Sequence, residues 1–222
     1  MKKSKTLAVV MIITTALFIL SLSIALPILF RPFYYWHINI LKLPQETGFT
    51  YDQIKTAYDE MLDFCLGLRS VFSTGVLRFS ESGMLHFVDV RGLFLLDLAV
   101  LIVSSLIIIL TRLLKKKAVV EPHRFYGHTP EYYGAELLAV VFIMITLLSL
   151  GNFDRTFVIF HKIFFPGKTN WLFNPYEDEI INVLPEVFFR NCAIAIVVIL
   201  IGLCTYFIIR DQNTRRREIL SA

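Results

Sequence analysis

Four long apolar runs constrain this chain more than any other feature of its sequence. They cover residues 7–30, 93–114, 134–151 and 191–209, and 56% of all residues are hydrophobic. Each run is close to the roughly 20 residues that an α-helix needs to cross about 30 Å of hydrocarbon. The sequence therefore predicts an all-α integral membrane protein, with one membrane domain over residues 1–222 and four transmembrane helices.

The basic residues predict how these spans are oriented. Twelve of the 22 Lys and Arg residues lie before the first span, in the last turn of the second span or the link that follows it, or after the fourth span. Cytoplasmic segments carry such an excess, so both termini are predicted to be inside. Two outer loops, residues 31–92 and 152–190, then form a small subdomain outside. This bias accounts for the formal net charge of +4, so we expect neither nucleic acid nor nucleotide as a partner.

The first run is expected to stay in the protein as a span. It is longer than the apolar part of a secretory signal peptide. It also lacks an A-x-A cleavage site.

The first outer loop is long enough to contain helices of its own. Thr50 has the side chain of an N-cap, and the spacing of apolar residues over 51–66 predicts an amphipathic helix. Ser80 or Ser82 is expected to cap a second helix that runs without a break into the second span. The alternative is a short hairpin, because the residues before Val90 also suit a strand.

The second outer loop has an unusual concentration of phenylalanine. Phe157, Phe160, His161 and Phe164 share one face of a predicted helix that ends at Pro166. The other faces of this helix are also largely apolar. We therefore expect it to lie in the membrane interface.

Each outer loop places one histidine where the chain meets lipid. His86 precedes the second span, and His161 lies in the Phe-rich helix. Taken alone, His86 is explained by a hydrogen bond to Asp89 one turn later, and His161 by packing among phenylalanines. Ionisable groups at membrane depth are more often functional than decorative. Because both loops lie on one side and offer aromatic surface for acyl chains, we predict that the two histidines form a catalytic pair.

Other polar and aromatic residues accompany this pair. Asn170 and Trp171 are expected to supply a donor and a wall for a substrate carbonyl, and Asp89 and Phe164 are also assigned to substrate binding. Asp97 lies inside the second span. It is expected either to orient a polar network or to pair with a neighbouring helix.

The sequence lacks the motifs of several enzyme classes, and it lacks the cysteine patterns of zinc sites and disulfide frameworks. The chain has no G-x-S-x-G elbow, no H-E-x-x-H and no Gly-rich phosphate loop. Its three cysteines, Cys65, Cys192 and Cys204, have no zinc spacing and form an odd set. Packing is the expected role of all three, with a Cys65–Cys192 bridge as the alternative.

The cytoplasmic link, residues 115–133, contains two more histidines, His123 and His128. They lie among Pro, Gly and Tyr residues, and no acid or cysteine accompanies them at ligand spacing. We therefore predict an ordinary solvated turn.

The residues around the candidate site resemble those of a known family. The second loop contains F-H-x-I-F-F-P-G-x-x-N-W-L-F-N-P, followed by Asp178 and then L-P-E-x-F-F, and His86-x-x-Asp89-Val90 leads into the second span. In length, span order and these motifs the chain resembles the lipoprotein intramolecular transacylases, small four-span membrane proteins of bacteria. The resemblance implies catalytic histidines at His86 and His161. It also implies a multi-pass protein of the bacterial cell membrane with its active site facing outside.

The resemblance further implies a reaction within a diacylglyceryl lipoprotein that is embedded among membrane lipids. The sn-2 acyl chain moves from glycerol to the α-amino group of the N-terminal cysteine and leaves a lyso-form lipoprotein. The amine has a reference pKa of about 7.7–8.0, so a base must take its proton and an acid must protonate the departing glycerol oxygen. We expect His86 to be the base and His161 the acid or oxyanion partner, with the reverse order as the alternative that the sequence leaves open. Asn170 or a backbone amide near Gly167 is expected to be the oxyanion donor.

No cofactor is expected for this reaction. Donor and acceptor belong to one molecule, so binding need only hold them in a reactive geometry without a protein nucleophile. Exchange of an ester for an amide is favourable, and neither ATP nor a metal ion is needed.

Two other functions remain open from the residues. A membrane lipid hydrolase with the same histidine pair would release free fatty acid. A non-catalytic adaptor or transport subunit would instead use polar residues of the second span to contact a partner helix. Four spans without an internal repeat or a broken helix pair argue against a stand-alone transporter.

Overall fold

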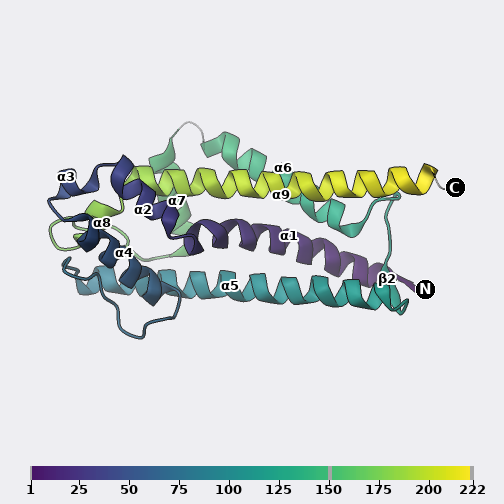
Figure 1. The fold of residues 1–222 in the computed structure, drawn as a ribbon, viewed down its shortest axis with the longest axis horizontal. Helices are drawn as coiled ribbons and strands as arrows, with labels where there is room; N and C mark the ends of the chain where they lie inside the picture. The colour runs from purple at the N-terminus through teal and green to yellow at the C-terminus, as the bar shows by residue number, and fades with distance from the viewer. Residues whose placement is uncertain (1, 150–151, 221–222) are drawn as a thin grey trace. The chain divides into compact units, whose positions relative to one another are not determined.

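The computed structural model describes residues 2–149 and 152–220, and helices dominate this part of the chain (Figure 1). The elements follow in the order β1 (Lys2–Ser4), α1 (Lys5–Leu29), α2 (Pro32–Ile40), α3 (Leu43–Thr47), α4 (Tyr51–Cys65), α5 (Glu81–Lys116), β2 (Val120–Pro122), α6 (Pro130–Ser149), α7 (Phe153–Phe164), α8 (Ile180–Val183) and α9 (Glu186–Leu220). Within the described residues, α1, α5, α6 and α9 are long and apolar enough to cross a membrane. The predicted all-α class with four transmembrane helices is confirmed.

The chain divides into two compact units, each built from segments that are distant in sequence. Unit 1 consists of Met1–Ala25, Leu98–Leu148 and Ala195–Ala222, and unit 2 of Leu26–Asp97 and Ser149–Ile194. Unit 2 therefore contains every residue that the sequence nominates for catalysis or substrate binding.

Unit 1 packs helices closely at small residues. A Cβ atom on Gly134 of α6 would lie 2.5 Å from the carbonyl oxygen of Ile12 in α1, so only glycine permits this approach. Small residues allow such contacts where lipid provides no hydrophobic drive between helices. β1 and β2 pair in parallel, with Ser4 opposite Pro122. The buried core of this unit consists of Ile19, Ala135, Leu138, Leu200, Cys204 and Phe207.

The link between α5 and α6 is not the solvated turn that the sequence predicted, because His128 is tied to α9. Its Nδ1 lies 2.6 Å from Oδ2 of Asp211, and Nη1 of Arg215 lies 2.6 Å from its Nε2. The backbone N–H of Thr129 donates to the other oxygen of Asp211 at 2.8 Å. The His128 ring also stacks on Tyr132 at 4.1 Å. The prediction for His128 was wrong because its carboxylate partner is 83 residues away, beyond the reach of local spacing rules.

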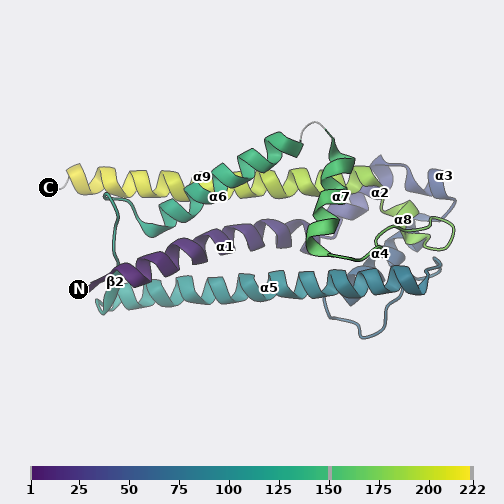
Figure 2. The same cartoon turned by 180° about the vertical axis from the view of Figure 1, so that it is seen from behind.

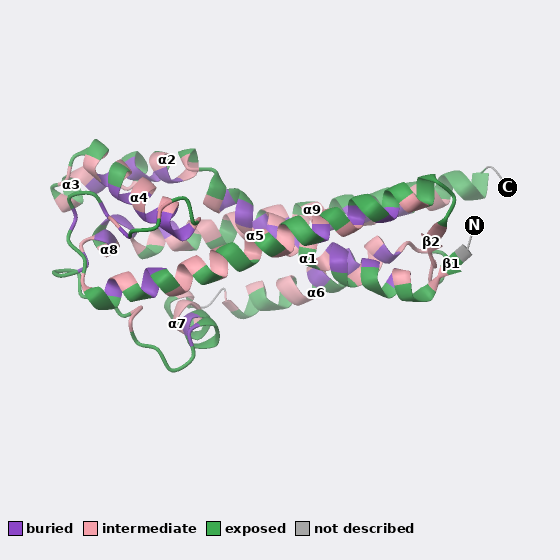
Figure 3. Ribbon diagram, turned by 90° about the horizontal axis from the view of Figure 1, so that it is seen from below, coloured by how far each residue is buried: buried purple, intermediate pink, exposed green. Residues whose placement is uncertain are grey.

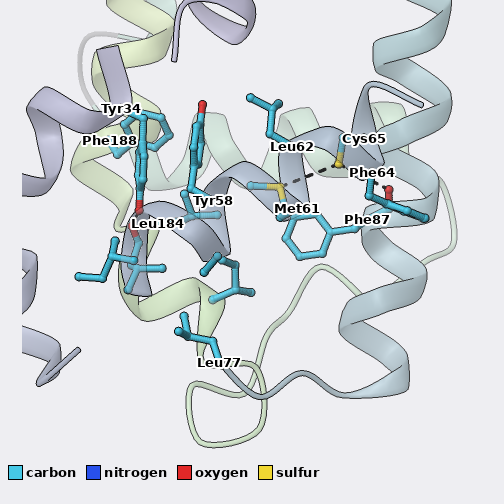
Figure 4. Packing of buried hydrophobic residues seen from close by; sticks show 14 of the residues in the cluster. Tyr34, Tyr58, Met61, Leu62, Phe64, Cys65, Leu77, Phe87, Leu184 and Phe188 are labelled. Carbon is cyan, nitrogen blue, oxygen red and sulfur yellow. Dashed lines mark hydrogen bonds between the residues drawn. The ribbon is translucent and has the colours of Figure 1, made fainter. Parts of the chain in front are cut away.

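Unit 2 has a core rich in aromatic rings (Figure 4). Tyr34 and Tyr58 stack with centroids 3.8 Å apart, and Phe188 meets Tyr34 edge-on at 5.0 Å. The buried hydroxyl of Tyr34 donates to the carbonyl of Val183 at 2.7 Å, so its polar end is satisfied. Figure 3 shows the buried residues of α4 and α8, two of the short helices that this core holds together.

The starts of α4 and α5 follow the capping signals in the sequence. Thr50 Oγ1 accepts from the N–H of Gln53 at 3.2 Å, and the Gln53 side chain accepts from the N–H of Thr50 at 2.8 Å, which completes a capping box. Ser80 Oγ accepts from the N–H of Gly83 at 3.0 Å at the start of α5. Because α5 then runs to Lys116 without a break, the helix prediction is confirmed and the hairpin alternative is wrong.

The cysteines are free thiols. Cys65 and Cys192 are not bridged, and Sγ of Cys65 lies 3.9 Å from Sδ of Met61 in the core (Figure 4). Burial raises the pKa of the Cys65 thiol to about 12, so it remains protonated and packs as an apolar group. Packing is thus confirmed for Cys65, and the alternative of a Cys65–Cys192 bridge is wrong.

Candidate active site

His86 and His161 lie beside each other in unit 2. Their ring centroids are 5.7 Å apart, with 34° between the ring planes. The two residues are only 5% and 7% exposed. His86 comes from the second turn of α5, and His161 comes from α7, which Figure 2 shows together with the loop that leads to α8. The tertiary structure therefore brings the two predicted histidines into one buried pair.

Aromatic rings surround both imidazoles. Those near His86 are Phe165 at 4.9 Å, Phe173 at 5.4 Å and Phe87 at 5.9 Å, measured between ring centroids. Those near His161 are Phe157 at 4.2 Å, Trp171 at 4.7 Å, Phe160 at 5.4 Å and Phe165 at 5.6 Å. The pair is thus enclosed by apolar surface that suits acyl chains and excludes water.

A tight turn after α7 decides which phenylalanine reaches the imidazoles. The N–H of Lys168 donates to the carbonyl of Phe165 at 3.1 Å, and Gly167 has φ +74°. Proline at the second position and glycine at the third are typical of a type II turn. Phe165 is 4% exposed and contacts both histidines, whereas Phe164 packs on Phe160 at 4.6 Å and is 48% exposed. Sequence reasoning nominated Phe164 and missed Phe165 and Phe173, although the Pro-Gly pair signals where the chain turns back.

A backbone hydrogen bond sets the protonation of His161. Its Nδ1 lies 2.8 Å from the carbonyl oxygen of Phe157, one helical turn earlier. A carbonyl oxygen can only accept, so Nδ1 carries the hydrogen and Nε2 of the neutral ring has the lone pair. Burial lowers the pKa of His161 below its ordinary value, although the bond to Phe157 acts in the opposite direction. His161 is therefore a neutral base near pH 7, with Nε2 as its accepting atom.

His86 has an unsatisfied ring nitrogen. Its Nδ1 is buried and has no hydrogen-bond partner among the described residues. A buried polar atom without a partner costs about 1–3 kcal/mol. Such an atom suits a hydrogen bond that a substrate supplies.

Asp89 ties the loop after α7 to α5. Its Oδ1 accepts from Nζ of Lys168 at 2.5 Å, and its Oδ2 accepts from Nδ2 of Asn170 at 3.1 Å. The indole N–H of Trp171 in turn donates to the carbonyl of Lys168 at 3.0 Å. The partners of Asp89 are thus residues of the loop. The hydrogen bond between His86 and Asp89, which a purely local interpretation of His86 expects, is not formed. Sequence reasoning missed Lys168, which helps to hold this loop against α5.

A second tie holds the acidic turn against the start of α5. Asp178 is 3% exposed and accepts from the N–H and the hydroxyl of Ser80 at 2.8 and 2.9 Å. A Cβ atom on Gly83 would lie 2.2 Å from Oδ1 of Asp178, so this contact requires glycine. Nε of Arg78 donates to Glu179 at 2.8 Å. The helix that carries His86 and the loop that carries Asn170 are therefore held at two points.

This arrangement can accept and return a proton within an apolar enclosure. A lone pair at Nε2 of His161 and an unpaired Nδ1 on His86 provide the two polar functions beside the aromatic rings. Over residues 2–149 and 152–220, no group of three or more His, Cys, Asp or Glu residues is arranged to hold a metal ion.

Known proteins share this fold over nearly its whole length. A model of the family described as lipoprotein intramolecular transacylase Lit matches residues 9–189. The solved structure of the membrane integral lipoprotein intramolecular transacylase Lit from Bacillus cereus is 25% identical and superimposes with a TM-score of 0.83, covering 98% of this chain and 97% of that one.

Two histidine variants of the same Bacillus cereus protein are also similar. The variant with arginine in place of a histidine is 25% identical, with a TM-score of 0.79 over 98% of this chain and 94% of that one. The variant with alanine in place of a histidine is 27% identical, with a TM-score of 0.75 over 96% and 94%. A comparison with curated proteins found no significant match.

Proposed function

The chain belongs to the lipoprotein intramolecular transacylase family, and on that premise we propose that His86 and His161 are the residues that catalyse its acyl transfer. It is a multi-pass membrane enzyme, and its substrate is a lipoprotein. The acyl chain leaves the sn-2 oxygen of the diacylglyceryl group and joins the α-amino nitrogen of the N-terminal cysteine. The observation that carries the proposal is the buried pair of imidazoles with free ring nitrogens.

In the first step the neutral amine attacks the sn-2 ester carbonyl carbon. A C–N bond forms, and Nε2 of His161 takes the proton that the amine loses. The hydrogen bond from Nδ1 to Phe157 supports His161 in this role, which reverses the division of labour expected from the resemblance. Nδ1 of His86 carries a hydrogen in this scheme and donates it to the carbonyl oxygen as negative charge develops.

In the second step the tetrahedral intermediate collapses. The bond between the carbonyl carbon and the glycerol oxygen breaks, and the protonated His161 returns its proton to that oxygen. The products are an N-acylated cysteine and a free sn-2 hydroxyl on one molecule. No atom is gained or lost, so the total mass of the lipoprotein does not change.

The aromatic enclosure favours transfer over hydrolysis. Phe165, Phe173 and Trp171 surround the histidines with apolar surface. Exclusion of water protects the ester and the intermediate from hydrolysis, so the tethered amine is the available nucleophile. This observation supports the transacylase over the lipid hydrolase.

We also infer that the site faces the outside of the bacterial plasma membrane. Twelve of the 22 Lys and Arg residues lie within residues 2–5, 112–124 and 210–217, which are separate from the two loops that build the site. An excess of basic residues is typical of cytoplasmic segments. A site in the other two loops is then on the side where mature lipoproteins are displayed.

Mass spectrometry of a purified diacylglyceryl lipoprotein tests the function directly. Incubation with the enzyme in detergent is expected to leave the total mass unchanged and to relocate one acyl chain to the N-terminal amine. His86→Asn and His161→Asn should abolish the relocation, whereas His123→Asn, the same change outside the site, should not. Loss of one acyl chain's mass would indicate a hydrolase, and full activity of either site variant would contradict the proposed pair.

A further inference from the structure

Asn170 presents one end of its amide to the protein and leaves the other end unpaired. Nδ2 donates to Oδ2 of Asp89 at 3.1 Å. A carboxylate beside the ammonium group of Lys168 is ionised and can only accept, so the amide nitrogen must face Asp89. Oδ1 therefore points elsewhere, where it is buried and has no hydrogen-bond partner among the described residues.

The neighbours of Asn170 lie at the candidate active site. Trp171, the next residue, has its ring 4.7 Å from that of His161. Asp89, which holds the amide, follows His86 by one helical turn on α5. Asn170 is thus connected to both histidines through immediate neighbours, and on this basis we assign its unpaired acceptor to the same site.

An unpaired buried acceptor selects for a donor. At the reacting end of a diacylglyceryl lipoprotein the ester carbonyl and the glycerol ester oxygen only accept hydrogen bonds, whereas the α-amino group donates them. Neither ester oxygen can donate a hydrogen bond to Oδ1, so neither can offset the free-energy cost of burying it. The amine is the reacting group with matching chemistry.

We propose that Oδ1 of Asn170 binds the free α-amino group of the substrate's N-terminal cysteine, an inference that rests on the proposed function. One N–H of the amine donates to Oδ1, which leaves the nitrogen lone pair to face the ester carbonyl and another N–H to face His161. Asp89 and Lys168 are positioning residues, because they hold the amide in this orientation. This role replaces the expectation that Asn170 donates to the substrate carbonyl.

The hydrogen bond from the α-amino group to Oδ1 of Asn170 also favours a substrate whose N-terminus is not acylated. Before the reaction the nitrogen has enough hydrogens for both Oδ1 and the base, but after it the amide nitrogen has only one. The product therefore loses a contact that the substrate makes. We expect this difference to favour product release.

A binding experiment with a non-reactive probe tests the inference. The probe is a dialkylglyceryl cysteine peptide with an ether at sn-2, and its partner is the same peptide with hydrogen in place of the α-amino group. The wild-type enzyme in detergent is expected to bind the amine probe about 3- to 10-fold more tightly than the desamino probe, the range for one hydrogen bond. Asn170→Leu, which is close in size, should reduce this preference to less than about 2-fold.

A matched control is available on α8. Asn182 is an exposed asparagine whose Nδ2 donates to the carbonyl of Pro175 at 3.0 Å, and Asn182→Leu should keep the full preference. Asn170→Ala repeats the test without added bulk if Asn170→Leu lowers the unfolding temperature. The inference is overturned if the wild-type enzyme does not distinguish the probes, or if a folded Asn170 variant still does.

Failure of this inference is separable from failure of the proposed function. The ether probe cannot transfer an acyl chain, so its binding does not depend on proton transfer by the histidines. If the enzyme prefers the amine probe but the histidine variants remain active, the role of Asn170 is supported and the catalytic pair is rejected. Inactive histidine variants, together with a preference that survives in Asn170→Leu, would reject only the role of Asn170.

Discussion

Two histidine groups of this molecule differ in what their ring nitrogens contact. In unit 1, Nδ1 of His128 meets Asp211 at 2.6 Å and its Nε2 meets Arg215 at 2.6 Å. In unit 2, Nδ1 of His86 has no partner among the described residues, and Nδ1 of His161 bonds to a backbone carbonyl, which leaves the lone pair of Nε2 for a substrate. A histidine whose two ring nitrogens both contact protein side chains is suited to holding structure together, whereas a free ring nitrogen is available to a substrate.

The two groups also differ in their immediate surroundings. His128 lies among charged and polar groups that the protein itself supplies. His86 and His161 are enclosed by aromatic rings, and the carboxylate nearest in sequence, Asp89, is already engaged by Lys168 and Asn170. Burial without polar compensation is costly, so it marks the place where a ligand is expected to complete the contacts.

The largest effect that follows from this comparison concerns the free nitrogens. His161→Asn is expected to lower kcat by about 10²- to 10⁴-fold, the usual contribution of general acid–base catalysis. His86→Asn is expected to lower kcat by about 10²- to 10³-fold, the usual loss when one oxyanion donor is removed. The loss in the double variant should be smaller than the product of the two single losses, because the proton transfer by His161 and the hydrogen bond from His86 act in the same transition state. Rates of acyl relocation, followed by mass spectrometry, measure this. Losses that multiply in the double variant would show that the two histidines act independently.

Displacement of the loop should have the next largest effect. Gly83→Ala places a Cβ atom 2.2 Å from Oδ1 of Asp178 and must move the acidic turn. Because small misplacements of reacting groups are costly, we expect a loss of about 10- to 100-fold in kcat/KM. Gly92→Ala is the control, since a Cβ atom on this glycine of the same helix meets nothing within 4 Å. Equal activity of the two variants would contradict the positional role of the Asp178 contact.

The pH dependence should separate His161 from the substrate amine. Burial lowers the pKa of His161 from 6.5, so the neutral base persists above pH 6.5 and is lost only as the pH falls further. The amine, with a reference pKa of about 7.7–8.0, must also be neutral to attack. We therefore expect kcat/KM to fall about 10-fold per pH unit below the amine pKa, and more steeply only once the pH drops below the lowered pKa of His161. A second fall in kcat/KM that begins above pH 6.5 and is absent from His161→Asn would contradict the lowered pKa of His161.

The smallest effect on activity is expected at the histidine whose nitrogens are engaged. His128→Ala leaves Asp211 without its ring partner and should lower the free energy of unfolding by about 1–3 kcal/mol. It should change kcat by less than about 2-fold, because His128 has no free nitrogen for chemistry. Chemical denaturation and the acyl relocation assay measure the two quantities. A loss of kcat as large as that in His161→Asn would remove the distinction between the two histidine groups.

Features of the fold that arise from local patterns could be predicted. The four apolar runs correspond to four long helices, and the Thr50 cap and the helix after Ser80 are present. The candidate histidines could also be recognised, because each has mostly apolar residues beside it in the sequence. Their separation was not predictable, since it depends on how α7 packs against α5.

Contacts between distant segments account for what sequence reasoning missed. Asp89 meets Asn170, Ser80 meets Asp178, and His128 meets Asp211 across 81, 98 and 83 residues. No local periodicity or capping rule links such positions. The choice of Phe165 over Phe164 likewise depends on a turn whose direction is decided by its packing.

The sequence by itself determined the class, the number of spans and the residues suited to proton transfer in an apolar setting. These properties depend on hydrophobicity, length and side-chain chemistry, which each segment carries with it. Only the tertiary structure decided which nitrogens are free, which amide oxygen is unpaired and which rings enclose the pair. Those properties depend on partners supplied by other segments, and a hydrogen bond exists only when folding brings both of its atoms together.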